Sequence, residues 1–456
     1  MSLGSRRGLV LAVVLFVILS VAWRARHIVD GGWRGARGYE FEWIAEPLSK
    51  GYGYTFAYAG RWLGPYDNPL TPTAWVEPVQ TGVMALAFRA LGEQGRMPLV
   101  LLNYLWFAAC CLLVFEIGRR VSSLSGGTVA AIALAALSPG KNELRWYIGN
   151  SALAAVLICG VALGLLMTFE RASLRRSAIL GLLLGVLALT HAGTMLFVPF
   201  AALIAVVAVR DDSAARRLAH GAIVLLTAAA VVLPWSIRNY QAFGEVVPVR
   251  TGLGQNMHYA LPALAQTIQP DIALGDGWPP PPWTAANARD AMSRILITTS
   301  WRELKNHSIA AGRAGGPADY SLLNEAQRDA ILREQSIDFI RNYPGFAIRL
   351  GIAKADGFFW SNWPDFRPVT VLAIIGALIT LRRRSGWIIG GLIVLYVVPY
   401  LLSAPIYYRY RAPIEPLLFV LCGVPVGLCF DAIRARRESG RRPRRGTSPA
   451  APTSVV

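Results

Sequence analysis

Long apolar runs recur along this 456-residue chain, and they limit what it can fold into more than any other feature. Each run holds roughly 15 to 22 residues, and an α-helix of about 20 apolar residues crosses the ~30 Å hydrocarbon core of a bilayer. Only 16% of the residues are charged and 54% are hydrophobic, a composition far from that of a soluble domain. The sequence therefore predicts an all-α polytopic membrane protein.

Arginine clusters between the runs predict the orientation of the chain. Arg6 and Arg7 precede the first run and place the N-terminus in the cytoplasm, because cytoplasmic loops carry an excess of Lys and Arg. Every later main cluster then also lands inside, so both termini are expected in the cytoplasm of a cell with this protein in its inner or plasma membrane. We expect about ten transmembrane helices (range 9–12), at residues 8–23, 98–118, 123–138, 150–169, 177–190, 194–209, 218–236, 367–381, 386–402 and 413–432.

One further apolar run, at residues 78–91, is only 14 residues long. It is too short to cross the bilayer comfortably, and a full crossing would move every later arginine cluster to the outside. We therefore expect a juxtamembrane helix that lies at the interface.

This topology divides the chain into modules. The region at 320–342 has apolar residues at helical spacing, and the tail is polar and Pro-rich, which favours disorder. The expected modules are an N-terminal transmembrane module at 1–236 with a first external loop at 28–96, an external, mainly helical region at 237–366, C-terminal transmembrane helices at 367–433 and a disordered basic cytoplasmic tail at 434–456.

The net charge of +18 does not indicate a nucleic-acid partner. The arginines fall in small clusters between apolar runs, as expected for a membrane protein. The five cysteines all lie within apolar runs and lack metal-ligand spacing, so we expect neither a disulfide framework nor a cysteine metal site.

Several short motifs follow one another in a recognisable order. They are Tyr39-Glu40, Ile44-Ala45, Leu48, Gly51-Tyr52-Gly53, Thr71-Pro72-Thr73-Ala74-Trp75, Ala90-Leu91-Gly92, the run from Leu233 to Tyr240, the stretch from Leu323 to Trp360, and the run from Tyr408 to Leu417. Together they resemble the GT-C superfamily of membrane glycosyltransferases, in particular glycosyltransferase family 39, the protein O-mannosyltransferases and the aminoarabinose transferase of lipid A. One stretch departs from the family pattern: Gln255-Asn256-Met257-His258-Tyr259 stands where the family often has a Gly-Asn pair.

This resemblance implies a GT-C-like helical bundle with external juxtamembrane helices. It also implies transfer of a sugar from a polyprenyl-phosphate donor to an acceptor on the external, periplasmic side. The acceptor is a glycan, a lipid or a protein, and membrane lipids surround the chain. Such chemistry needs a carboxylate that takes a proton from the acceptor and positive charge that stabilises the departing phosphate.

Glu40 is the first candidate for the carboxylate, because it follows the first span where the family has an acid. The alternative is a solvated glutamate, or one paired with Arg34 or Arg37. Glu77, beside Pro78, is the second candidate.

Another external loop carries Lys141 and Glu143, which the resemblance places near the donor or a metal. The alternative for Glu143 is a salt bridge with Lys141 or Arg145. No cofactor is indicated, and a divalent metal is compatible with the sequence, since a site made of carboxylates and water leaves no spacing signature.

For the donor phosphate the expected residues are Arg238, Arg409 and Arg411, at external ends of helices where arginine runs against the general trend. Their alternative role is to anchor the helices at the interface. His258 is a further candidate for substrate binding, and His191 caps an external turn; for both, the alternative is a structural hydrogen bond.

Two other functions compete with glycosyl transfer. A transporter or flippase of lipid-linked glycans would place charges or broken helices at mid-membrane, often in two related halves; the spans hold few charges, and no matching half is seen. A non-catalytic scaffold that binds partners through residues 237–366 would leave the acid-rich first loop unexplained.

Overall fold

The computed structural model describes residues 3–56, 71–138, 143–209, 213–261, 323–361, 364–403 and 408–440. Within these ranges the regular structure is helical, and the only β contacts are two isolated bridges. The all-α membrane fold predicted from the sequence is confirmed. One helix coincides with each of the ten predicted spans: α1 (Leu3–Val29), α4 (Arg96–Val121), α5 (Leu124–Leu137), α7 (Ser151–Glu170), α8 (Leu174–Thr190), α9 (Phe197–Ala208), α10 (Ala214–Phe243), α17 (Arg367–Thr380), α18 (Arg384–Ser403) and α20 (Glu415–Gly440).

Not all of these helices are long enough to span a bilayer alone. In the described part of the chain, six helical stretches meet the length and hydropathy of a span, and a seventh does if the bent pair Pro344–Trp360 and Pro364–Thr380 counts as one. The helices Leu124–Leu137 and Ala192–Ala208 are apolar but shorter.

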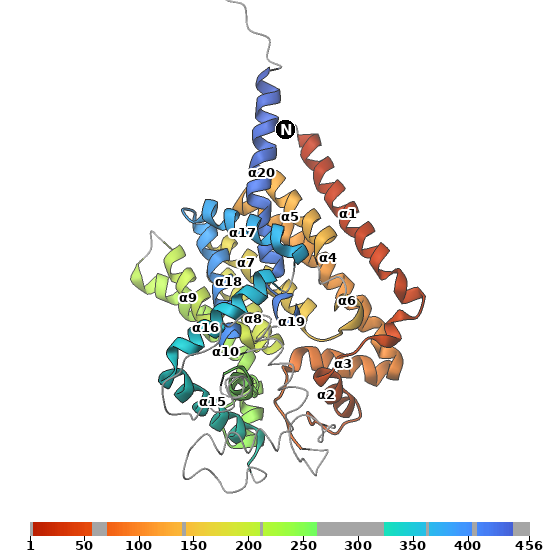
Figure 1. Cartoon of the computed structure of the whole chain (residues 1–456), viewed down its shortest axis with the longest axis vertical. Helices are drawn as coiled ribbons and strands as arrows, with labels where there is room; N and C mark the ends of the chain where they lie inside the picture. Colours follow the sequence, from red (N-terminus) through yellow and green to blue (C-terminus); the bar gives the residue numbers. More distant parts are fainter. Residues whose placement is uncertain are drawn as a thin grey trace, which may run out of the picture.

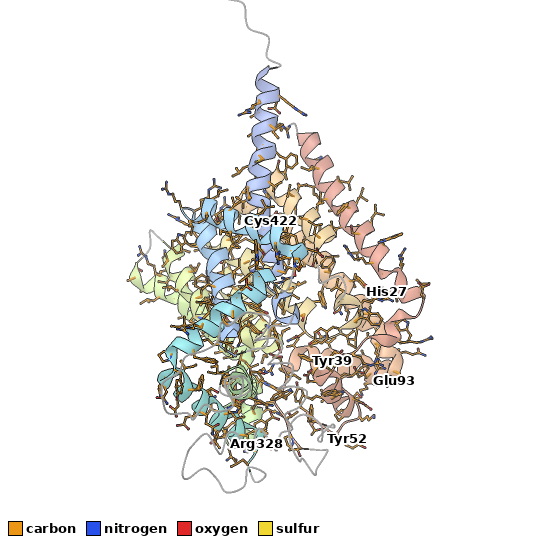
Figure 2. All side chains as sticks on the ribbon, viewed as in Figure 1. His27, Tyr39, Tyr52, Glu93, Arg328 and Cys422 are labelled. Carbon is orange, nitrogen blue, oxygen red and sulfur yellow. The ribbon has the colours of Figure 1, made fainter. Side chains whose placement is uncertain are left out.

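The remaining helices gather mostly at one end of the bundle. They are η1 (Gly32–Gly35), α2 (Glu40–Ser49), α3 (Pro78–Leu91), η2 (Gly92–Gly95), α6 (Glu143–Trp146), η4 (Ala192–Thr194), α11 (Leu253–Ala260), α15 (Glu325–Asn342), α16 (Pro344–Asp356), η6 (Gly357–Ser361), η7 (Pro364–Phe366) and α19 (Tyr408–Arg411). The start of α1 and the end of α20 lie together at the opposite end (Figure 1). Tyr39, Tyr52 and Arg328 mark the end where the first loop and α15 meet (Figure 2).

The chain turns sharply between α3 and α4. By length and composition the run Pro78–Val121 counts as one candidate span. Gly92, however, has φ 55 and ψ −137, and a Cβ on Gly95 would lie 2.7 Å from the carbonyl oxygen of Ala87. Such proximity eight residues apart needs a reversal of the chain, because a straight helix would separate these residues by about 12 Å. We therefore treat α3 as a separate helix that precedes α4.

Helix α10 continues beyond the end expected from the sequence. It runs through Pro234 and stops at Phe243, where Gly244 has the left-handed φ of 68 typical of a helix C-cap. A proline within a membrane helix does not have to end it. The added turns carry Arg238 and Asn239 as helical residues.

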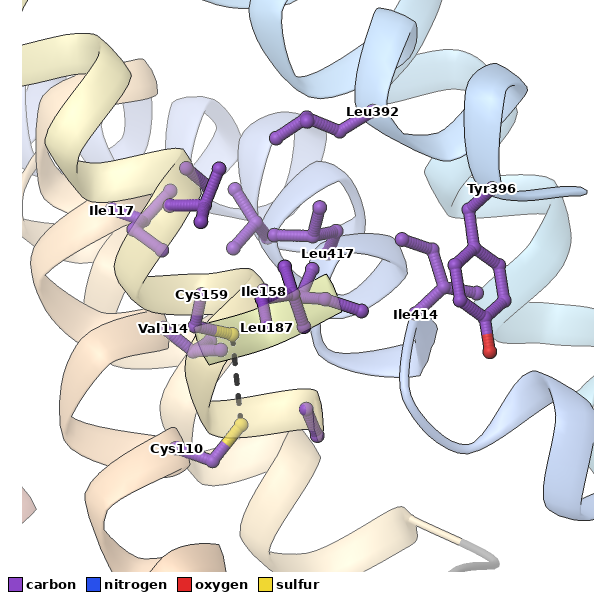
Figure 3. Close-up of a cluster of buried hydrophobic side chains, with 14 of the residues drawn as sticks. Cys110, Val114, Ile117, Ile158, Cys159, Leu187, Leu392, Tyr396, Ile414 and Leu417 are labelled. Atoms are coloured by element: carbon purple, nitrogen blue, oxygen red, sulfur yellow. Dashed lines mark hydrogen bonds between the residues drawn. The ribbon is translucent and has the colours of Figure 1, made fainter. Parts of the chain in front are cut away.

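Glycines allow α5 and α20 to pack at backbone distance in the centre of the bundle. A Cβ on Gly427 would lie 2.4 Å from the Cα of Gly126, and one on Gly423 would lie 2.4 Å from the carbonyl oxygen of Gly126. Small residues at such contacts let membrane helices gain close van der Waals packing. Helices α4, α7, α8, α18 and α20 contribute to a shared apolar core (Figure 3).

The cysteines in this core are free thiols. Cys110 and Cys159 approach to 3.6 Å between their sulfur atoms as hydrogen-bond partners, and only Cys429 is exposed. The prediction of lipid- or core-facing cysteines is therefore confirmed.

Replacing Gly427 with Val should destabilise the bundle, because the new side chain would collide with Gly126. Overpacking of this kind costs about 1–3 kcal/mol. The midpoint of thermal unfolding of the detergent-solubilised protein measures it. Gly390→Val is the matched control, since nothing lies within 4 Å of a Cβ at Gly390. Equal midpoints for the two variants would contradict the close packing of α5 and α20.

Candidate functional site

The loop that follows α1 is fastened to the bundle by backbone and side-chain bonds. The amide of Arg37 donates to the carbonyl of Trp146 at 2.9 Å, and the amide of Ile148 donates to the carbonyl of Arg37 at 3.1 Å. The buried carboxylate of Glu42 accepts from the amide of Gly38 at 2.8 Å and pairs with Arg96. These bonds fix where α2 begins.

Glu40 is the first residue of α2 and lies directly after a strained position. Tyr39 has φ 48 and ψ −124, and it is the only non-glycine residue with positive φ in the described ranges. Within those ranges Glu40 makes no ion pair. The expected alternative partner, Arg37, donates instead to the carbonyls of Arg34 and Ala36. The partly exposed carboxylate of Glu40 is therefore available to a substrate.

Glu77, the N-cap residue of α3, is buried with 2% of its surface exposed. Its Oε1 accepts from the amide of Ala192 at 2.9 Å, and its Oε2 accepts from the side-chain amide of Asn150 at 3.4 Å. A guanidinium nitrogen of Arg250 lies 3.5 Å from Oε1. A buried carboxylate needs such donors and a counter-charge, because an isolated buried charge is costly.

Arg250 interacts electrostatically with both Glu77 and Glu40. Burial alone would lower the pKa of Arg250, but the surrounding acidic groups outweigh it and raise the pKa above its ordinary value; Glu77 acts most strongly and Glu40 also contributes. Its Nε donates to the carbonyl of Thr251 at 3.0 Å, and its guanidinium lies over the ring of Trp75. Among the described residues none accepts from Nη2, so this nitrogen can donate to a ligand.

A hydrogen-bonded group of polar side chains continues inward from Glu77. Asn150 donates to the carbonyl of Thr190 at 2.8 Å and lies 3.1 Å from Nδ1 of His191. The hydroxyls of Tyr400 and Tyr396 lie 2.6 Å and 3.0 Å from Nε2 of His191. The Asn150 NH₂ has two hydrogens for three neighbouring acceptors, the carboxylate of Glu77, the carbonyl of Thr190 and this ring nitrogen.

Burial lowers the pKa of His191 to about 4. The positive charge of Arg250 lowers it too, while Glu77 raises it, and burial is the largest of these effects. His191 is therefore neutral at physiological pH and serves as a fixed hydrogen-bonding group. It holds α18 against the turn that contacts Glu77.

Neither Arg250 nor this histidine–tyrosine group was predicted as part of the site. His191 was expected at a turn, more often as a structural residue than as a catalyst. Arg250 lacked a helix-end motif, and only the folded contact with Glu77 identifies it. A sequence signal existed in two polar residues at the ends of apolar helices, Asn150 before α7 and His191 after α8.

Two of the three arginines predicted for the phosphate bind other parts of the protein. The guanidinium of Arg238 donates to the carbonyls of Thr73 at 2.7 Å and Tyr54 at 2.8 Å, so it fastens the first loop to α10. Arg411 is 1% exposed, donates to the carbonyl of Phe358 at 3.3 Å and lies 3.7 Å from Glu415.

The other predicted site residues are either buried or outside the described part of the chain. His258 is buried on α11. Glu143 begins α6, and its side chain lies outside the described residues, as do Lys141 and the side chain of Arg409. In the described part of the chain, no group of three or more His, Cys, Asp or Glu could hold a metal ion.

A cleft that is partly open to solvent enters the bundle near the first loop. Tyr147 lines it, and its ring lies 6.2 Å from that of Tyr39, between centroids. Its wall is mainly apolar with a few polar groups, as is usual for ligand pockets. The lining residues are Phe107, Cys110, Leu134, Ser138, Leu144, Tyr147, Ser151, Ala152, Ala155, Ala412, Glu415 and Pro416.

Acid should destabilise the protein through His191. The unfolded histidine has a pKa near 6.5 and the folded one about 4, so between these values the unfolded chain binds more protons. Stability is then present above pH 6.5 and is lost as the pH falls towards 4, by about 3 kcal/mol in all. Thermal unfolding of the wild type and of His191→Gln between pH 7 and pH 5 measures this. An equal loss of stability between pH 7 and pH 5 in both proteins would contradict the lowered pKa of His191.

Solved structures share this architecture. The oligosaccharyltransferase of Archaeoglobus fulgidus tethered to an acceptor peptide matches with a TM-score of 0.53 and 12% identity, over 94% of this chain and 50% of that one. The same archaeal enzyme, AglB, in complex with an inhibitory peptide and a dolichol-phosphate matches with a TM-score of 0.53 and 11% identity, over 97% and 52%. The chain thus spans about half the length of these structures.

ArnT from Cupriavidus metallidurans bound to undecaprenyl phosphate shows a weaker likeness, with a TM-score of 0.37. The identity is 15%, over 97% of this chain and 81% of that one. No family model and no curated protein matches the sequence. At 11–12% identity the likeness to AglB shows the fold alone, and AglB is a GT-C glycosyltransferase. This chain has the fold of the GT-C membrane glycosyltransferases.

Proposed function

We propose that the protein is an integral membrane glycosyltransferase that moves a sugar from a polyprenyl-phosphate donor to an acceptor on the external side of the membrane. The main support for the proposal is the ion pair between Glu77 and Arg250. Glu40 also contributes to the raised pKa of Arg250. Two carboxylates and a cation with a nitrogen from which no described residue accepts suit this transfer. The dolichol-phosphate in the AglB complex is a ligand of the same class.

In the proposed reaction, Glu40 takes the proton from the acceptor hydroxyl or amine. The acceptor atom forms a bond to the anomeric carbon of the sugar while the bond from that carbon to the phosphate oxygen breaks. The electron pair of the broken bond stays on the polyprenyl phosphate. Glu40 is the better base of the two carboxylates because it has no ion pair among the described residues, whereas Glu77 is held by three donors.

Arg250 is proposed to bind the phosphate. Its Nη2 is available, while Nε and Nη1 are fixed by Thr251 and Glu77, so the guanidinium is held ready for an anion without rearrangement. Arg250 is added to the residues expected from the sequence, and Arg238, two of whose donors bind loop carbonyls, stays proposed for the donor side. Arg409 and Arg411 remain proposed for the donor side, with Glu143, Lys141 and His258 as proposed substrate contacts.

The donor is proposed to enter the cleft beside Tyr147. The deep wall of the cleft is apolar, including Phe107, Leu134 and Ala155, and suits an isoprenoid chain. The outer part lies beside Tyr39, one residue before Glu40, so a sugar at this position would lie next to the proposed base.

Glu40→Gln should lower transfer by roughly 100-fold or more, the usual loss when an acid–base group is removed. Membranes that contain the variant, supplied with a polyprenyl-phosphate sugar and an acceptor, give the turnover. Glu46→Gln is the matched control on the same helix, because Glu46 is exposed and pairs with Lys50 at 2.7 Å. Normal turnover in Glu40→Gln would move the base to Glu77.

The proposed topology has both termini in the cytoplasm and the first loop outside. In a background without native cysteines, Tyr52→Cys should react with an impermeant maleimide added to intact cells, since Tyr52 is 59% exposed. Ser213→Cys, at the exposed N-cap of α10, should react only after the cells are opened. Labelling of Ser213→Cys in intact cells would indicate the opposite orientation and contradict the proposed topology.

A further inference from the structure

The turn that carries Arg250 is held by two buried acids of a distant helix. Glu325, the first residue of α15, accepts from the hydroxyl of Thr73 at 2.6 Å, from the amide of Ala74 at 3.1 Å and from the hydroxyl of Thr251. Its carboxylate therefore joins the first external loop to the residue that follows Arg250. Glu325 is 9% exposed, so these bonds form away from bulk water.

Asp329, one helical turn further along α15, binds the next residues of the same turn. Its Oδ1 accepts from the amide of Gly252 at 2.9 Å and from the amide of Gln255 at 3.1 Å. Gly252 has a φ of 92, and a Cβ there would lie 3.0 Å from the ring of Trp75 and 3.2 Å from the guanidinium of Arg250. The backbone next to Arg250 is thus fixed on one side by α15 and on the other by Trp75.

The position of α15 is itself determined independently of Arg250. Asn324 and Gln327 form a capping box at the start of the helix, and the side chain of Asn324 donates to the carbonyl of Phe243 at 2.8 Å. Ala326 packs with Ala74 and Phe243. These contacts connect α15 to the end of α10, so a displacement at Glu325 would be passed to the turn and not absorbed by the helix.

We propose that Glu325 and Asp329 are positioning residues that act through Arg250. They hold residues 73–75 and 250–252 together, so that the guanidinium stays 3.5 Å from Glu77. The inference rests on the proposed role of Arg250 in glycosyl transfer. It assigns a function in the reaction to α15.

The physical reason is the sensitivity of such sites to geometry. A misplacement of about 1 Å in a charged group costs on the order of 10²-fold in rate. The carboxylate of Glu325 accepts three bonds, whereas a glutamine side chain at this position would offer one acceptor oxygen and one NH₂ donor that faces other donors. Glu325→Gln therefore keeps the size of the side chain and disrupts the bonds that orient the turn.

A double-mutant cycle tests the inference. Glu325→Gln should lower kcat by about 10-fold or more in the wild-type background and by less than about 2-fold in Arg250→Ala, because the effect passes through the guanidinium that is missing. Asp338→Asn is the control on the same helix, since Asp338 is partly exposed and pairs with Arg341 at its surface. Independent, multiplying losses in the double variant would overturn the positioning role.

Two further results separate this inference from the proposed function. Normal turnover of Arg250→Ala alone would overturn the proposed role of Arg250, and the inference with it. A large loss in Arg250→Ala with an undiminished effect of Glu325→Gln would overturn the inference only.

A second measurement does not depend on the folding of the Arg250 variant. Phenylglyoxal should modify Arg250 several-fold faster in Glu325→Gln than in the wild type, read by peptide mass spectrometry, while Arg96 in its pair with Glu42 should react at an unchanged rate. Equal acceleration at both arginines would indicate general loosening and would overturn the inference, as would no acceleration at Arg250.

Discussion

The site depends on one ion pair, between the buried Glu77 and the partly exposed Arg250. Removing two charges from water is costly, and their attraction offsets the cost only where further hydrogen bonds satisfy the remaining donors and acceptors. Here the amide of Ala192 and the side chain of Asn150 bind the carboxylate, while the carbonyl of Thr251 binds the guanidinium. Four segments that are distant in sequence must therefore meet before the pair is stable, and this requirement organises the external end of the bundle.

The membrane part provides the frame for these segments. Backbone contact between α5 and α20 requires Gly126, Gly423 and Gly427, since apolar helices in a bilayer gain from close packing more than from hydrophobic burial. The turn after α8 and the start of α7 then bring His191 and Asn150 together. Tyr396 and Tyr400 on α18 hold the other face of His191. The polar group is thus fixed by helices that run in the bilayer.

The helices were predictable from the sequence, and the partners of the charged groups were not. Apolar runs and arginine clusters identified ten helical segments and the separate α3, because chain-local hydrophobicity decides both. The end of α10 was missed, since Gly244 and not Pro234 terminates it. The two carboxylates predicted for catalysis, Glu40 and Glu77, both raise the pKa of Arg250. Sequence patterns did not reveal that Arg238 would bind the first loop or that Arg250 would bind Glu77, because those contacts join residues 165 and 173 positions apart.

The most direct test of the central claim is the binding of a polyprenyl phosphate without a sugar to the purified protein in lipid nanodiscs. The account predicts saturable binding by the wild type, an affinity at least about tenfold weaker in Arg250→Ala, and a smaller loss in Arg250→Lys, because lysine keeps the charge but loses the guanidinium fork. Equal affinity of the wild type and Arg250→Ala would contradict the claim that the Glu77–Arg250 pair forms the phosphate site.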